Sequence, residues 1–208
     1  MNAFRGFRAL ASALVAVTLL AGCSALELRP KPMAFYDLGL GPAAVLPAAL
    51  SPLAVDVNAA PWLGASVMQY RLNWNDPDRR RAYSEARWAS PPAEMLHVTL
   101  QRGLNVGAGG IQCRLHVDLY EFHQLFESAT ESSVEVVLRA GLLRPRSDKA
   151  FAAREFRVRE AAPSADAVGG VTAYRAAGVQ LVSEIAAWII ELDREAGQGL
   201  NMVQRCGS

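Results

Sequence analysis

The sequence predicts one domain of the α/β (α+β) class, a mainly antiparallel sheet with two principal helices packed on it. Apolar and polar residues alternate in three consecutive segments between residues 111 and 158, which is typical of strands with one buried face. In the last long segment, apolar residues recur every three or four positions, which predicts a helix. With 208 residues, 51% of them hydrophobic and 20% charged, the chain is neither disordered nor a small disulfide-rich scaffold.

The first 22 residues are expected to be a secretory leader rather than part of the fold. Arg5 and Arg8 precede an apolar run, residues 9–20, and small residues follow at Ala21 and Gly22, which is the plan of a signal peptide. The run of about 12 residues is shorter than the roughly 20 that cross a bilayer, so a cleaved leader is favoured over a membrane-spanning anchor.

The leader ends in Leu20-Ala21-Gly22-Cys23, which resembles the bacterial lipobox of secreted lipoproteins. Cys23 is therefore the predicted lipidation site; the alternative is a cysteine placed there by chance. Three acyl chains would hold the protein on a membrane permanently, because two already anchor stably. Ser24 differs from the aspartate that retains many lipoproteins at the inner membrane, which favours the periplasmic side of the outer membrane. Residues 23–35 are the expected lipidated tether, and residues 36–208 the folded domain.

The first elements of the domain are predicted to be strands. Residues 53–57 form a short β-type run, and residues 67–74 form a second. Turn-forming residues at 75–78 then predict a hairpin, in which residues 81–87 return beside the second strand.

A helix is predicted to follow the hairpin. Ser90 supplies a capping hydroxyl before Pro91 and Pro92, which suit the first turn of a helix. The glycine-rich segment 103–110 is expected to end this helix. It is not a phosphate loop, because such a loop connects a strand to a helix N-terminus, whereas the order here is helix, glycines, strand. The apolar residues of the helix recur on one face: Met95, Leu96, Leu100 and Leu104.

Three strands are predicted to form an antiparallel meander after the glycines. In the first, residues 111–126, the apolar face carries Cys113, Leu115, Val117 and Leu119, and the polar face carries Arg114, His116, Asp118 and Tyr120. Residues 134–142 repeat the alternation. Phe156 and Val158 mark the third strand, after a turn at residues 145–149.

The final helix has a wide apolar stripe. Such a stripe suits a coiled-coil seam, a membrane-surface face or docking on a sheet. Its width, the lack of flanking basic residues and its position after a meander favour docking on the sheet. The stripe consists of Val171, Tyr174, Gly178, Leu181, Val182, Ile185, Trp188, Ile189 and Leu192.

Two cysteines remain once Cys23 is acylated, namely Cys113 and Cys206. An even pair in an exported chain predicts a disulfide between them. The alternative is two free thiols, with Cys113 a small core residue.

No catalytic, metal or cofactor site is predicted. His97 falls on the first helix, and His116 and His123 are seven residues apart on one strand, which places them on opposite faces. The nucleophile-elbow and zinc-protease motifs are absent from the sequence. A formal net charge of +1, without a basic block, argues against a nucleic-acid partner.

Several short sequence segments resemble those of the ABC-type transport auxiliary lipoprotein family, which contains the PqiC-type lipoproteins. They include Phe35-Tyr36-Asp37-Leu38, Met68-Gln69-Tyr70-Arg71-Leu72, the stretch from Tyr83 to Arg87-Trp88-Ala89-Ser90-Pro91-Pro92, Leu119-Tyr120-Glu121-Phe122 with Phe126, and Pro163-Ser164-Ala165. The family-motif residues that we single out are Tyr36, Tyr70, Arg71, Trp88 and Pro91.

The resemblance implies a non-enzymatic docking subunit of an intermembrane lipid transport system. Its expected partners are an ABC permease and ATPase and a mammalian-cell-entry (MCE) domain protein, and a homo-oligomer is expected to match a ring-shaped partner. The alternative is a lipoprotein or cell-envelope enzyme that acts alone on a lipid or small molecule, for which an apolar pocket between helix and sheet would be the site.

Overall fold

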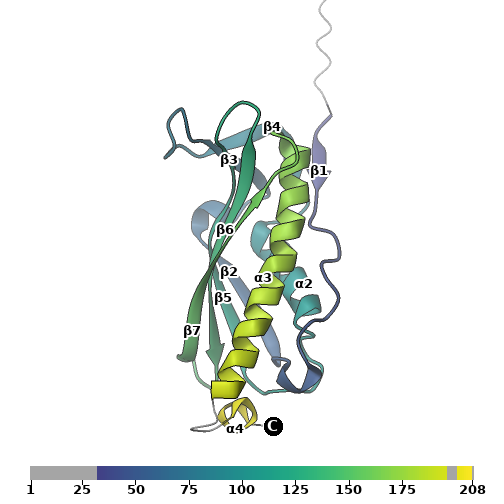
Figure 1. The fold of residues 1–208 in the computed structure, drawn as a ribbon, viewed down its shortest axis with the longest axis vertical. Coiled ribbons are helices and arrows are strands. Elements are labelled where there is room, and N and C mark those ends of the chain that lie inside the picture. Colours follow the sequence, from purple (N-terminus) through teal and green to yellow (C-terminus); the bar gives the residue numbers. More distant parts are fainter. Residues whose placement is uncertain (1–31, 196–200, 208) are drawn as a thin grey trace, which may run out of the picture. The chain divides into compact units, whose positions relative to one another are not determined.

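The computed structural model describes residues 32–195 and 201–207, so the leader, Cys23 and most of the expected tether lie outside the described residues. The described strands are β1 (Ala34–Tyr36), β2 (Ala54–Ala59), β3 (Val67–Leu72), β4 (Arg81–Trp88), β5 (Arg114–Phe126), β6 (Ser132–Leu143) and β7 (Ala150–Ala161). The helices are α2 (Pro92–Gly103), α3 (Ala167–Glu195) and α4 (Met202–Cys206), with short 3₁₀ turns η2 (Ala48–Leu50) and η3 (Pro61–Leu63). In this part of the chain, helices and a single sheet confirm the predicted mixed α/β class (Figure 1).

Seven strands of the described chain form one sheet, with the order β1-β4-β3-β5-β6-β7 and with β2 also paired to β5. The predicted β3–β4 hairpin and the β5-β6-β7 meander are both antiparallel. Three further pairs, β1–β4, β2–β5 and β3–β5, are parallel. The long strand β5 can pair with both β2 and β3, because β2 pairs with its residues 114–119 and β3 with its residues 124–126.

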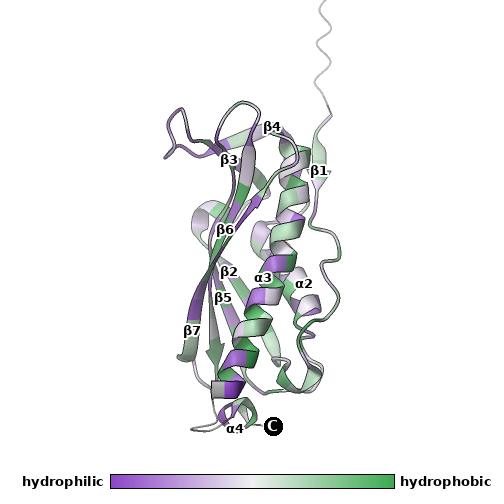
Figure 2. Cartoon of the chain, viewed as in Figure 1, coloured by the Kyte–Doolittle hydropathy of each residue, from purple (hydrophilic) through white to green (hydrophobic). Residues whose placement is uncertain are grey.

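The core lies between the sheet and the helices α2 and α3, which lie on the same side of the sheet (Figure 1). Leu100 of α2, Val117 of β5 and Leu181 of α3 are fully buried there. The apolar stripe predicted for the last helix therefore docks on the sheet, and α3 alternates between hydrophobic and hydrophilic bands (Figure 2). The opposite side of the sheet is free of helices in the described part of the chain. We call it the helix-free face.

The predicted alternation of β5 changes at Tyr120. Leu119 pairs with Leu138 and Glu121 with Val137, so Tyr120 is an extra, bulged residue without a partner in the register. A bulge inserts one residue and shifts every later side chain to the other face. The prediction that His116 and His123 lie on opposite faces is therefore wrong, and both lie on the helix-free face.

The start of α2 also differs from the prediction. Pro91 occupies the position before the first helical residue, and the Ser90 hydroxyl donates a hydrogen bond to the Glu94 carboxylate instead of capping the backbone. Pro92 explains this difference, because a proline disfavours the helical conformation in the residue before it; Pro91 therefore stays extended and the helix begins at Pro92, one residue too late for Ser90 to cap it. At the other end, the helix stops at Gly103 and a glycine-containing loop leads into β5, as predicted.

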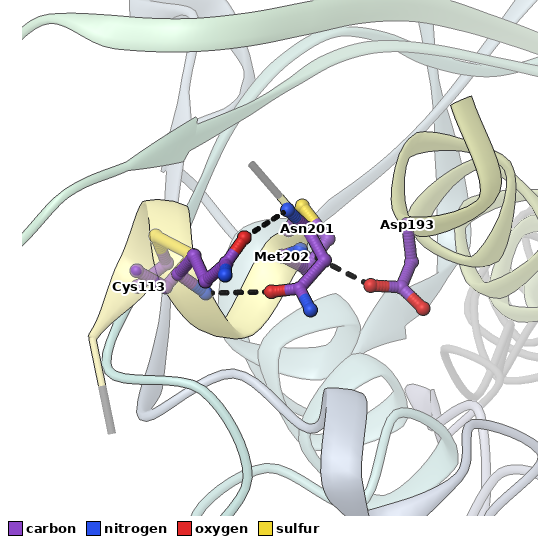
Figure 3. Close-up of a disulfide and its surroundings, with 6 residues drawn as sticks. Cys113, Asp193, Asn201 and Met202 are labelled. Atoms are coloured by element: carbon purple, nitrogen blue, oxygen red, sulfur yellow. Dashed lines mark hydrogen bonds between the residues drawn. A yellow bond between two sulfur atoms is a disulfide. The ribbon is translucent and has the colours of Figure 1, made fainter. Parts of the chain in front are cut away.

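The C-terminal helix α4 is attached to the start of β5. A disulfide joins Cys113 and Cys206, whose Cα atoms are 4.9 Å apart (Figure 3). Asn201 and Gln204 form a capping box, and the Met202 amide donates to Asp193 Oδ1 of α3 at 3.1 Å (Figure 3). Both ends of α4 are thus tied to the domain.

Candidate functional site

Two of the family-motif residues, Trp88 and Tyr70, pack against other aromatic rings of the domain rather than forming a reactive site. Trp88 is buried in β4, with its ring edge-on to Phe122 and Tyr174 at 5.6 and 5.1 Å. Tyr70 packs against Tyr83 at 4.9 Å. Such aromatic packing stabilises the fold but offers no chemistry.

Two further motif residues lie at the ends of elements. Tyr36 ends β1 and pairs with Trp88 in the parallel register, and the Ala89 amide donates to the Tyr36 carbonyl at 2.7 Å. Pro91 precedes the first residue of α2. Both residues therefore help to fix the path of the chain from β4 into α2.

Arg71 is the motif residue that reaches the helix-free face, where it belongs to a cluster of charged side chains. Its Nη2 lies 3.6 Å from Glu121 Oε1, and Arg80 donates to both oxygens of Glu121 at 2.6 and 2.7 Å. His123 is buried between Glu121, at 3.1 Å from Nδ1, and Glu135, at 3.7 Å from Nε2. We call these five residues, Arg71, Arg80, Glu121, His123 and Glu135, the ionic cluster.

The cluster shifts the pKa values of two of its members. Burial lowers the pKa of His123, since the charged imidazolium loses its hydration; the nearby carboxylates oppose this shift without reversing it. Burial acts to raise the pKa of Glu121, but the hydrogen bond and charge of Arg80, together with His123 and Arg71, lower it below its usual value. The two shifts favour an ionised Glu121 beside a neutral His123 at neutral pH.

A hollow of about 490 Å³ lies beside the cluster on the same face. The surface is concave where small residues, Gly141, Ala150 and Ala153, form the floor of the hollow. Charged and polar side chains from β2, β5, β6 and the β6–β7 turn surround this floor: Asp56, Arg114, His116, Asp118, Arg139 and Asp148. A concave surface with both signs of charge suits a polar protein segment better than a lipid chain.

The polar groups of the hollow contact one another rather than forming a catalytic arrangement. Arg114 lies 3.5 Å from Asp56 and 3.8 Å from Asp148. His116 Nε2 lies 3.3 Å from Asp118 Oδ1. Across residues 32–195 and 201–207, no group of three or more His, Cys, Asp or Glu side chains is arranged to hold a metal ion, and no helix is long and apolar enough to cross a membrane.

Sequence reasoning missed the ionic cluster. The strand alternation that we extrapolated through Tyr120 placed Glu121 and His123 among the apolar residues of the core face. The surrounding arginines come from the β3–β4 hairpin, and their approach to β5 depends on a parallel pairing between segments about 50 residues apart, for which single-sequence patterns carry no signal. The repeated Arg79-Arg80-Arg81 run in the hairpin was the only hint of a carboxylate partner.

Comparison with known proteins places these features in a family context. A family model described as "ABC-type transport auxiliary lipoprotein component" matches residues 55–186, more than half of the chain. No protein with a curated function matches at a significant level.

Two solved structures have a similar fold. Protein XCC0632 from Xanthomonas campestris, of family DUF330, is 20% identical with a TM-score of 0.61, over 81% of this chain and 97% of that one. A second, titled only as an uncharacterized protein, is 18% identical with a TM-score of 0.57, over 76% of this chain and 99% of the other. At these identities the likeness concerns the fold alone.

Proposed function

Because the chain belongs to the family of ABC-type transport auxiliary lipoprotein components, we propose that it is a non-enzymatic docking subunit of an intermembrane lipid transport system. The family match over residues 55–186 carries this proposal. In the proposed system, a separate ATPase and permease supply the energy and the inner-membrane passage. The present chain holds an MCE-domain protein at the membrane to which it is anchored.

Anchoring is proposed to occur through acylated Cys23, at the periplasmic face of the outer membrane. The leader and the lipobox-like Leu20-Ala21-Gly22-Cys23 support a lipid anchor. Ser24, in place of an aspartate, supports the outer over the inner membrane. The two remaining cysteines form a disulfide, which suits an oxidising compartment such as the periplasm.

The helix-free face is the proposed docking surface for the partner protein. Arg139 and Asp148 are exposed in its hollow, Arg114 is half-buried there, and Arg80 and Glu121 of the ionic cluster beside it form an ion pair. Charged groups around a concave surface steer association and set specificity, more than they add raw affinity. By contrast, the space between the helices and the sheet is filled by fully buried side chains such as Leu100, Val117 and Leu181. That packing lends no support to a stand-alone lipid carrier.

Co-purification tests the proposal. The full-length, tagged lipoprotein is solubilised from membranes in mild detergent, and the MCE protein and permease are sought among the proteins that co-elute. Arg139→Glu reverses an exposed charge on the helix-free face and is expected to reduce recovery of the partner several-fold. Arg102→Glu makes the same charge change on α2, on the opposite side of the sheet, and is expected to leave recovery unchanged.

The two halves of this experiment answer separate questions. If neither the MCE protein nor the permease co-elutes with the wild-type protein, the proposed function is overturned. If both co-elute but Arg139→Glu and Arg102→Glu behave alike, the helix-free face is not the docking surface, and the assignment of the partner stands.

A further inference from the structure

We infer that the loop between β3 and β4, residues 73–80, contacts the phospholipid surface to which the chain is anchored, with Trp74 in the headgroup region. The inference rests on the proposed anchoring at Cys23. It adds a second membrane contact, made by the folded domain itself, which would fix how the domain stands on the bilayer.

The loop exposes Trp74 from a fixed backbone. The Trp74 side chain is 51% exposed and lies in a loop that is otherwise hydrophilic (Figure 2). The Asn73 amide donates to the Phe126 carbonyl at 2.9 Å, and the Arg79 amide to the Asp76 carbonyl at 3.2 Å. Arg71 also donates to the Pro77 carbonyl at 3.2 Å. The hydrogen-bonded backbone of the loop therefore keeps the large aromatic side chain of Trp74 exposed to solvent.

The loop lies at the end of the domain where the chain enters. β1 runs parallel to β4, with Ala34 beside Ala86 and Tyr36 beside Trp88. The first residue of β1 and the loop that precedes β4 therefore lie toward the same end of these two strands, and β1 and this loop are both found at the upper end of the view in Figure 1. Phe35, 67% exposed on β1, adds a second uncovered apolar side chain near this entry point.

The tether is short enough to keep this end near the membrane. Nine residues lie between Cys23 and Met33, the first residue of the compact domain, and the ten residue-to-residue steps span at most about 33 Å when fully extended. The part of the domain nearest to Met33 is thus confined to a layer next to the lipid headgroups. Trp74 is within reach of that layer because its loop shares this end of the domain.

The chemistry of the loop suits a phospholipid interface. Tryptophan is enriched at the boundary between headgroups and acyl chains, since its ring is apolar and its N–H can reach water or a phosphate ester. Arg79, exposed in the same loop, supplies a cation for the phosphate groups. Asp76 and Asp78 keep the loop close to neutral overall, so the ring rather than net charge provides the contact.

Quenching by brominated lipid tests the inference on the acylated full-length protein. The protein is reconstituted into vesicles of phosphatidylethanolamine and phosphatidylglycerol, with or without bromine atoms near the upper end of the acyl chains. Trp88 and Trp188 are buried in the core and thus shielded. We expect bromine-dependent quenching in the wild type, and a reduction of about two-fold or more in Trp74→Phe.

Trp62 provides the matched control. It is also 51% exposed, but its Nε1 donates to the Tyr120 carbonyl at 3.3 Å and Arg80 covers its ring, so it lies against the helix-free face rather than in the loop. Trp62→Phe is expected to keep the quenching of the wild type. Equal quenching in the wild type and Trp74→Phe would overturn the inference. So would a Trp74→Phe variant that loses partner recovery without any change in quenching, because the loop would then bind protein.

Flotation of the vesicles separates failure of the loop contact from failure of the anchor. If the protein floats with the vesicles but Trp74 is not quenched, only the loop contact is wrong. If the acylated protein does not float at all, the anchor proposed under the function fails, and the loop contact is overturned with it.

Discussion

At the scale of single residues, His123 links the stability of the domain to pH. Its imidazole is buried, and burial lowers its pKa below the ordinary 6.5. At a pH below 6.5, His123 is protonated in the unfolded chain but stays neutral in the folded chain. The unfolded state therefore binds more protons, and the free energy of unfolding declines as the pH falls. The pKa of Glu121 is also lowered, and its contribution is lost at still lower pH, as the pH falls through its folded value.

We predict that His123→Gln flattens part of this pH dependence between pH 6.5 and 4.5, because glutamine has no proton to take up. Urea unfolding at several pH values measures the effect, with the wild type as the reference. An independent check is the NMR titration of the His123 ring in the folded protein. A midpoint above 6.5 would show that Glu121 and Glu135 outweigh burial, and would contradict the prediction.

A second residue-scale feature is the buried Gln124, which joins three strands and the segment that precedes α3. Gln124 of β5 accepts a hydrogen bond from Tyr83 of β4 at 2.9 Å, and its amide donates to Ser132 of β6 at 2.8 Å and to the Asp166 carbonyl at 3.1 Å. A fully paired buried network of this kind specifies one packing arrangement, because removing a member leaves the others unsatisfied.

We therefore expect Gln124→Leu, which keeps the approximate volume but removes both hydrogen-bonding groups, to lower the free energy of unfolding by about 2–4 kcal/mol. The Tyr83 hydroxyl and the Ser132 hydroxyl would each lose a partner. Chemical denaturation measures the loss. The matched control is Gln101→Leu on the exposed side of α2, which is expected to stay within about 0.5 kcal/mol of the wild type.

At the scale of elements, the contact between α2 and α3 depends on glycine. A Cβ atom added at Gly103 would lie 2.4 Å from Cγ1 of Val182, whereas one added at Gly178 would lie 3.4 Å from Cγ2 of Thr99. The first distance is a clash with a stiff β-branched side chain, and the second is an ordinary contact. The two helices can therefore approach closely at Gly103, and only there is glycine required.

The same exchange is thus predicted to have opposite effects at the two sites. Gly103→Ala is expected to lower the free energy of unfolding by about 1–3 kcal/mol through overpacking. Gly178→Ala, inside the long α3 helix, is expected to be neutral or to raise it by up to about 1 kcal/mol, because alanine favours helix. Thermal denaturation of the two variants side by side measures both effects. Equal destabilisation at both positions would contradict the close approach at Gly103.

The elements also show what the sequence can predict. The β3–β4 hairpin, the meander and both principal helices follow from local periodicity and turn residues, and the structure confirms them. The parallel pairs join segments that are distant along the chain, so no local pattern reports them. The bulge at Tyr120 arises from the pairing of β5 with β6, and it determines which face of the sheet carries Glu121 and His123. The ionic cluster therefore could not be predicted from the sequence either.

At the scale of the whole molecule, the Cys113–Cys206 disulfide joins the start of β5 to the C-terminal helix α4. It closes a loop of 93 residues, for which the chain-entropy model gives a stabilisation of roughly 3–5 kcal/mol. We expect Cys113→Ser/Cys206→Ser to lose stability of this order and α4 to detach first, since noncovalent contacts would then hold it, among them the Met202 amide on Asp193, the Gln112 amide on the Gly207 carbonyl and the buried Met202 side chain. Denaturation with and without reductant measures the loss.

The state of the two thiols can be read directly from the protein taken from its own compartment. Mass spectrometry after alkylation under non-reducing conditions is expected to find neither Cys113 nor Cys206 modified. Two alkylated cysteines would contradict the bridge, and the double serine variant would then match the wild type in stability.

The proposed lipid anchor would determine where the whole molecule works, and it leads to a further prediction. A single interfacial ring at Trp74 binds a membrane only marginally, whereas acyl chains on Cys23 would hold it almost irreversibly. Cys23→Ser is therefore expected to release the protein into the soluble periplasmic fraction after a carbonate wash, even with the β3–β4 loop intact. Globomycin, which blocks lipoprotein signal cleavage, should likewise cause the unprocessed precursor to accumulate. If Cys23→Ser stayed with the membranes, the domain would be held there by its own surface or by a partner, and the short tether could no longer explain how it is oriented.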